Sequence, residues 1–130
     1  MRALLTVWLF LFACCASAQQ ADGVRVSVAA RSQIGITTAY DPAYSRIAYP
    51  MGDVPQSRGV CSDVVIRAYR KVGIDLQKLV HEDMQKHFSV YPKIWGLKKT
   101  DSNIDHRRVP NLEVFFKRQG KSLADLQTAD

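Results

Sequence analysis

One cysteine lies outside the first fifteen residues of the chain: Cys61, in the segment RGVCSDVVIRAYRKVGIDL. A cysteine attacks a carbonyl carbon as its thiolate, and the unpaired N–H groups at the start of a helix favour that anion. The residues after Cys61 predict a helix, which places this thiol on a first turn. From the residues alone, two interpretations stay open: Cys61 is a nucleophile, or it is a small apolar side chain that fills the core.

Charged residues near Cys61 are candidates for binding or orienting a substrate. Arg58, three residues before the cysteine, adds positive potential that favours a thiolate, whereas Asp63 opposes it or orients a partner group. Asp53, in the turn sequence GDVP, is a further hydrogen-bonding candidate across the loop and the helix. Helix capping and turn formation explain both aspartates equally well.

A nucleophilic cysteine needs a base that takes its proton, and histidine is the commonest one. His81 and His87 are six residues apart on a predicted helix, so they point in different directions. His106 is the better candidate, because NIDHRRVPN is predicted to be a loop in which functional groups converge. Asp105 or Asn111 would then orient its imidazole.

The segment DHRR, which contains His106 and Arg107, has a second interpretation that the residues favour more. In that interpretation it is structural or contacts the substrate.

The sequence HEDMQKH, at residues 81–87, suggests a metal site. Because these side chains spread over more than half the circumference of a helix, they cannot all face one ion. No metal and no cofactor is predicted.

The elements that position these residues are predicted to be mainly helical. Apolar residues at three- and four-residue intervals predict helices over residues 24–34, about 60–72, 75–88 and 110–123. The expected end signals are Gly35, Gly73 and Gly120, with Asp75 as an N-terminal cap and Pro110 in a first turn. In the second helix the predicted apolar face consists of Val60, Val64, Val65, Ala68, Tyr69 and Val72. Leu76, Leu79, Val80, Met84 and Phe88 form the predicted apolar side of the third.

Two long connections join these helices. Residues 36–59 are rich in proline, glycine, aspartate and serine, which predicts an irregular loop over the domain. Its tyrosines, Tyr40, Tyr44 and Tyr49, are available to pack or to line a groove. Residues 89–109 are predicted to be a connection anchored by Trp95. No run of strands able to form a sheet is evident.

The first eighteen residues, MRALLTVWLFLFACCASA, have the form of a secretory signal peptide with cleavage after Ala18. The alternative is a lipoprotein anchored at Cys14. Since the apolar run is shorter than the roughly 20 residues that span a bilayer, no transmembrane segment is predicted. An exported single domain over residues 19–130, periplasmic or extracellular, is expected.

The chain has 18 Lys and Arg against 12 Asp and Glu, but these charges are scattered, which argues against nucleic-acid binding.

The segment VCSDVVIRAYRKVGIDL resembles the nucleophile segment of the papain-like NlpC-type cell-wall hydrolases. Over residues 29–123 the chain is also similar to the YijF-like family of uncharacterised secreted bacterial proteins. The blocks that carry this similarity are ARSQIGITTAYDPAY, YPMGDVPQSRGVCSDVVIRAYRKVGIDLQKLVHEDM, YPKIWGL and NIDHRRVPNLEVFFKRQGKSL.

The resemblance implies an α+β fold of the papain-like type, present here mainly as its helical, nucleophile-bearing part. It implies a cysteine hydrolase of the amidase or peptidase type that acts on cell-wall peptides through Cys61. The NlpC-type enzymes commonly carry aspartate where this chain has Val60. Their later strands, with Gly-Asp-Ile-Val-like and His-Ile-Gly-like segments, are not found before Asp130. The expected consequence is a truncated sheet and weak or no catalysis. The alternative is a non-catalytic envelope protein that binds peptidoglycan or a protein partner through the tyrosine loop and DHRR.

Overall fold

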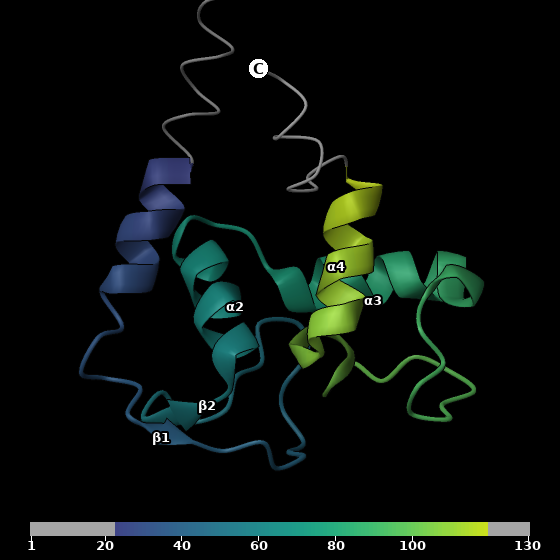
Figure 1. The fold of residues 1–130 in the computed structure, drawn as a ribbon, viewed down its shortest axis with the longest axis horizontal. Coiled ribbons are helices and arrows are strands. Elements are labelled where there is room, and N and C mark those ends of the chain that lie inside the picture. The colour runs from purple at the N-terminus through teal and green to yellow at the C-terminus, as the bar shows by residue number, and fades with distance from the viewer. Residues whose placement is uncertain (1–22, 120–130) are drawn as a thin grey trace, which may run out of the picture.

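The computed structural model describes residues 23–119, and the structural statements below refer to these residues. They form a group of packed helices with a two-stranded sheet at one end (Figure 1). This mixture of helices and a small sheet agrees with the expected α+β class. The predicted signal segment, Cys14 and the predicted helix stop at Gly120 lie outside the described residues.

Four helices occupy the ranges that the sequence patterns predicted. The first covers residues 23–31, followed by α2 (Cys61–Lys71), α3 (Leu76–His87) and α4 (Val109–Arg118). Two short 3₁₀ helices, η1 (Phe88–Val90) and η2 (Asp105–Arg107), complete the list. Asp75 caps α3, since its carboxylate accepts a hydrogen bond from the backbone N–H of Gln77 at 3.1 Å. Local signals of this kind explain why the helix bounds could be predicted.

A small parallel sheet lies within the segment that was predicted to be irregular. Strand β1 (Ala39–Tyr40) pairs with β2 (Arg58–Gly59), in the register Ala39 with Arg58 and Tyr40 with Gly59. Strands of two residues are too short to produce a detectable alternation of apolar and polar residues. The pairing brings the two ends of the long loop together beside the start of α2 (Figure 1).

The hydrophobic core lies between α3, α4 and one side of α2. Its buried members are Ile66, Leu76, Val80, Met84, Tyr91, Leu112 and Phe115. The predicted apolar face of α2 was correct for Ala68, which is buried, and for Tyr69, which packs against the core, but wrong for Val65, which is 38% exposed. The side that α2 buries also includes Ser62, Asp63 and Arg67. Periodicity analysis counts apolar residues and therefore cannot detect a helix face that is buried through ion pairs.

Trp95 does not anchor the connection between α3 and α4 in the core. Its side chain is 36% exposed, and the guanidinium of Arg108 lies 4.1 Å from its ring centroid. The predicted contact of Leu79 was also wrong, since that residue is 41% exposed. Tyr91 is the apolar residue that this connection buries, and its hydroxyl donates to Asp83 at 2.6 Å.

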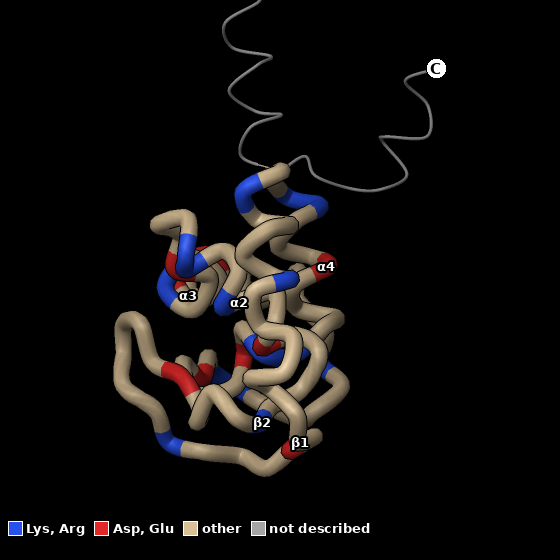
Figure 2. The backbone as a smooth tube through the Cα atoms, turned by 90° about the vertical axis from the view of Figure 1, so that its left-hand side faces the viewer, with Lys and Arg blue, Asp and Glu red and all other residues tan. Residues whose placement is uncertain are grey.

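Charged residues are distributed over the whole fold. Figure 2 shows acidic and basic positions mixed along the chain rather than gathered on separate faces. Among the helices of the described residues, none has the length and apolarity needed to span a membrane.

Candidate functional site

Cys61 is the first residue of α2, and its side chain is exposed. It therefore does not fill the core, which was one of the two interpretations of the sequence. The thiol borders a shallow depression of about 210 Å³. The depression is lined by Thr37, Thr38, Ala39, Tyr40, Gly59, Val60, Cys61 and Val64. Pairing of β1 with β2 thus places the 37–40 segment beside the cysteine.

The start of α2 is fixed by contacts with η2, a segment more than forty residues later. Ser62 donates its hydroxyl hydrogen bond to the carbonyl oxygen of Arg107 at 2.6 Å. The carboxylate of Asp63 receives two hydrogen bonds from the Arg107 guanidinium, at 2.8 and 2.9 Å. Both side chains of this ion pair are only 3% exposed. Cys61 points outward while the next two residues hold the helix in place.

A glycine precedes this helix for a steric reason. A Cβ atom on Gly59 would lie 2.6 Å from Oδ2 of Asp63, and the φ angle of Gly59 is +153°. The same carboxylate oxygen accepts a hydrogen bond from the backbone N–H of Val60 at 2.7 Å. Asp63 therefore caps the helix on which it lies, and its tight packing excludes a side chain at position 59.

Asp63 stays ionised although it is buried. Burial acts to raise its pKa, but the hydrogen bonds from Arg107 and from the Val60 N–H outweigh burial and lower the pKa below the ordinary value. On the partner side, the hydrogen bonds with Asp63 raise the pKa of Arg107. The pair is thus a permanent salt bridge at neutral pH that positions the start of α2.

His106 is buried, whereas the thiol of Cys61 is exposed. The histidine lies in η2 with 2% of its surface exposed, whereas NIDHRRVPN was predicted to be a loop. It does not line the depression at Cys61, and no hydrogen bond joins the two side chains among the described residues. Its Nδ1 atom is buried without a hydrogen-bond partner in that part of the chain. Burial, followed by repulsion from Arg107, lowers its pKa to about 4.

This pKa predicts an acid-sensitive fold. A histidine pKa lowered from 6.5 to about 4 means that the unfolded chain binds more protons between these values, so stability falls as the pH drops through this range. Between about pH 7 and about pH 4.5, the unfolding free energy of the wild type is expected to fall by about 2 kcal/mol more than that of His106→Gln. Urea unfolding at both pH values measures it. The exposed His87, changed to glutamine, is the matched control, and an equal pH dependence in wild type and the His106 variant would contradict the prediction.

The other predicted site residues have structural contacts. Asp53 receives two hydrogen bonds from Arg67, and Arg58 lies 3.4 Å from Asp41 with half of its side chain exposed. Asn111 donates to the backbone carbonyl of Asp105 at 3.0 Å and does not contact the imidazole of His106 through any described hydrogen bond. Asp105 is 1% exposed, and burial raises its pKa.

Arg67 is the residue of this region that sequence reasoning missed. Its guanidinium donates to both oxygens of Asp53, at 2.8 and 3.1 Å, and to the hydroxyl of Thr37 at 3.1 Å. It also donates to backbone carbonyl oxygens of the 54–58 loop: Val54, Pro55 and Arg58. The sequence feature that could have identified it is the spacing of Arg67, Arg70 and Lys71, which places three basic residues on one face of the helix.

The remaining histidines have local partners. The ring of His81 lies edge-on to Tyr49 at 5.0 Å, and His87 contacts the carboxylate of Asp83 at 3.2 Å. Within residues 23–119, no three or more His, Cys, Asp or Glu side chains gather as ligands for a metal ion.

Comparison with known proteins shows the family. Residues 27–130 match the family described as "Domain of unknown function (DUF1287)", and the chain belongs to this family. A relative from Escherichia coli strain K12, "Uncharacterized protein YijF", is 62% identical over 104 residues. The match covers 80% of this chain and 51% of that protein, so the chain spans about half the length of this curated relative. No solved structure matches the chain.

Proposed function

We propose that this chain is the nucleophile-bearing part of a papain-like cysteine hydrolase that cleaves amide bonds in cell-wall peptides. The observation that carries the proposal is the exposed thiol of Cys61 at the first residue of α2, beside a depression large enough for part of a peptide. The resemblance of VCSDVVIRAYRKVGIDL to the NlpC-type nucleophile segment supports it. Export through the signal-type segment at residues 1–18 is part of the same proposal.

The reaction would follow the usual course of thiol catalysis. The thiolate of Cys61 attacks the carbonyl carbon, the C–N bond breaks as the amine leaves with a proton, and water then hydrolyses the thioester. The N–H group of Asp63 donates to the carbonyl oxygen of Val60 at 3.0 Å, so among the first N–H groups of α2 those of Cys61 and Ser62 are the ones proposed to stabilise the oxyanion. These N–H groups and the thiol are the parts of the machinery that residues 23–119 supply.

The general base is assigned to a segment outside the described residues. No imidazole lines the depression at Cys61 within the part of the chain that the structure covers. The E. coli relative is about twice as long as the match, so it contains further residues that can supply one. This chain alone is therefore expected to turn over weakly or not at all.

Two measurements test the proposal. Iodoacetamide is expected to alkylate Cys61 in the native protein because the thiol is exposed, and Cys61→Ser should remove that modification. The full-length E. coli relative is expected to release new amino groups from muropeptides and to lose this activity after alkylation. Hydrolysis that survives alkylation, or its absence with all muropeptides, would reject the cysteine mechanism. Robust turnover by this chain alone, abolished by Cys61→Ala, would reject the assignment of the general base to the further residues of the longer relative.

A second function, non-catalytic binding of peptidoglycan, is favoured by the exposed loop tyrosines. Tyr40, Tyr44 and Tyr49 are 78%, 55% and 43% exposed. The DHRR segment does not offer a binding surface, since residues 105–107 are buried. Co-sedimentation with insoluble peptidoglycan that survives Cys61→Ser and is lost on Tyr40→Ala would favour this function over hydrolysis.

A further inference from the structure

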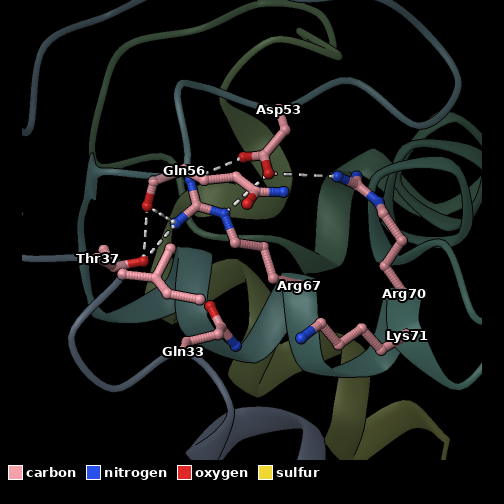
Figure 3. Close-up of a pocket in the computed structure, with 8 residues that line it drawn as sticks. Gln33, Thr37, Asp53, Gln56, Arg67, Arg70 and Lys71 are labelled. Carbon is pink, nitrogen blue, oxygen red and sulfur yellow. Dashed lines mark hydrogen bonds and ion pairs between the residues drawn. The ribbon is translucent and has the colours of Figure 1, made fainter.

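A second pocket lies on the same side of α2 as the depression at Cys61. It has a volume of about 330 Å³. The polar residues that line it include Gln33, Thr37, Gln56, Arg67, Arg70 and Lys71 (Figure 3). Thr37 also lines the depression at Cys61, so the two hollows adjoin. We call the combined surface from Cys61 to Lys71 the α2 groove.

Helix geometry gives this groove a direction and a length. Val64, Arg67 and Lys71 follow at intervals of three and four residues, so they share one face of α2. Val64 lines the Cys61 end, whereas Arg67 and Lys71 line the other. Ten residues separate Cys61 from Lys71, which corresponds to about 15 Å along the helix axis. An extended peptide of four residues has nearly the same length, about 13–14 Å.

The far end of the groove carries an uncompensated positive charge. Arg67 is neutralised by Asp53, and Arg70 lies 3.7 Å from Asp53 and 3.6 Å from Asp75. Lys71 is different, because its ammonium group contacts only the hydroxyl of Ser32 and has no carboxylate within 4.0 Å among the described residues.

The walls between the two ends are suited to an amide ligand. Figure 3 shows the Gln33 carboxamide and the Lys71 ammonium group on one side of the pocket, with Gln56 and Asp53 across from them. The Gln33 amide group donates to the carbonyl oxygen of Val64 at 2.9 Å, so this side chain is held in place. The Gln33 carboxamide oxygen is buried and has no hydrogen-bond partner within residues 23–119.

We infer that the α2 groove binds a short extended peptide with a free carboxylate, the carboxylate at Lys71 and an amide bond near Cys61. The inference rests on the proposed function and specifies its substrate class. A single uncompensated ammonium group suits one carboxylate, whereas a polyanion such as nucleic acid requires several. Lys71 is a substrate-binding residue in this arrangement and has no role in bond cleavage.

The test is a binding measurement in the Cys61→Ser variant, which removes the thiol. Acetyl-tetra-alanine with a free carboxylate and its C-terminal amide differ only in charge. By NMR titration, the carboxylate form is expected to bind about fivefold more tightly and to shift the backbone amides of Thr37, Val64 and Lys71. Lys71→Gln should abolish the difference between the two peptides. Lys86, in the last turn of α3, is the matched control, and Lys86→Gln should preserve it.

The outcomes separate this inference from the proposed function. Equal affinity for the two peptides, or shifts confined to residues outside the groove, would overturn the α2 groove as a carboxylate site. This comparison uses the Cys61→Ser protein and so remains decisive even if Lys71→Gln fails to fold. A carboxylate preference that depends on Lys71 supports the groove whether or not muropeptides are hydrolysed. Hydrolysis without that preference would leave the cysteine mechanism intact and reject the groove.

Discussion

Replacing Arg107 by alanine is expected to lower the free energy of unfolding by about 3–5 kcal/mol. The change leaves the carboxylate of Asp63 buried without its guanidinium partner, since both side chains are 3% exposed in the native pair. Removing one member of a buried pair costs more than the pair contributes, because the remaining charge is left without water or a counter-ion. Urea unfolding at neutral pH measures the loss.

The pH dependence identifies the cause. The pKa of Asp63 is held below 3.8 in the folded protein, so the stability that it contributes is present above that value and is lost as the pH falls through the folded pKa. The difference between wild type and Arg107→Ala should therefore shrink below about pH 4. A difference that stays constant down to acid pH would assign the loss to packing alone.

Two further variants complete this experiment. Arg118 makes a similar two-bond contact with Asp83, at 2.8 and 3.2 Å, but lies at the surface. Arg118→Ala should therefore cost clearly less than Arg107→Ala. The double change Asp63→Leu with Arg107→Met should cost less than Arg107→Ala alone, because no unpaired charge remains. A double variant as unstable as the single one would show that the hydrogen bonds themselves dominate.

The buried ion pair also matters for Cys61. Asp63 is two residues after the cysteine and caps the same helix through the Val60 N–H. When the Arg107 side chain is lost, the first turn of α2 loses its ion pair with η2 and keeps only the hydrogen bond from Ser62 to the backbone carbonyl of residue 107. Arg107 is thus a positioning residue for the thiol. The DHRR motif is explained by this structural role and does not require contact with a substrate.

Local signals explain the parts of the fold that could be predicted. The Asp75 cap and the spacing of Leu76, Val80 and Met84 identified α3 correctly because each signal lies within one helix. The burial of Ser62 and Asp63 in α2 was not predicted, because it depends on Arg107, which is 44 residues away from Asp63 in the sequence. Pairings at that separation leave no periodicity in the helix itself.

In the candidate site, too, the features that local sequence patterns determine could be predicted, and those that depend on distant contacts could not. The position of Cys61 on a first turn followed from the helix pattern, and the structure places it there. Whether a thiol at a helix start is exposed depends on which neighbours are buried, and this is decided by the contacts of Ser62 and Asp63. His106 was the candidate base because its segment was predicted to be a loop, yet residues 105–107 form the buried helix η2. The adjoining pockets along α2 depend on how residues 33–40 fold back over the helix.

Arg67→Met is expected to release the loop that covers α2. The arginine side chain is 7% exposed and joins one helix to Asp53, to Thr37 and to four backbone carbonyls between residues 54 and 58. Methionine retains the apolar stem but leaves these acceptors without a donor. A loss of about 3 kcal/mol in unfolding free energy is expected, since a buried hydrogen bond to a charged group contributes about 1.5–3 kcal/mol. Part of the charge on Asp53 remains compensated by Arg70 at 3.7 Å.

Hydrogen exchange locates this effect in the structure. The amides of Thr38 and Ala39 both donate to the carbonyl oxygen of Ser57, at 3.0 and 3.1 Å, so they report whether the two ends of the loop stay together. In Arg67→Met they should exchange at least about tenfold faster, as expected for local opening made easier by about 1.4 kcal/mol. Arg58→Met is the control on the same loop, because that side chain is half exposed and has one ion pair at 3.4 Å. Unchanged exchange at Thr38 and Ala39 in Arg67→Met would mean that β1 and β2 hold the loop without Arg67. The groove beside Cys61 would then not depend on this arginine.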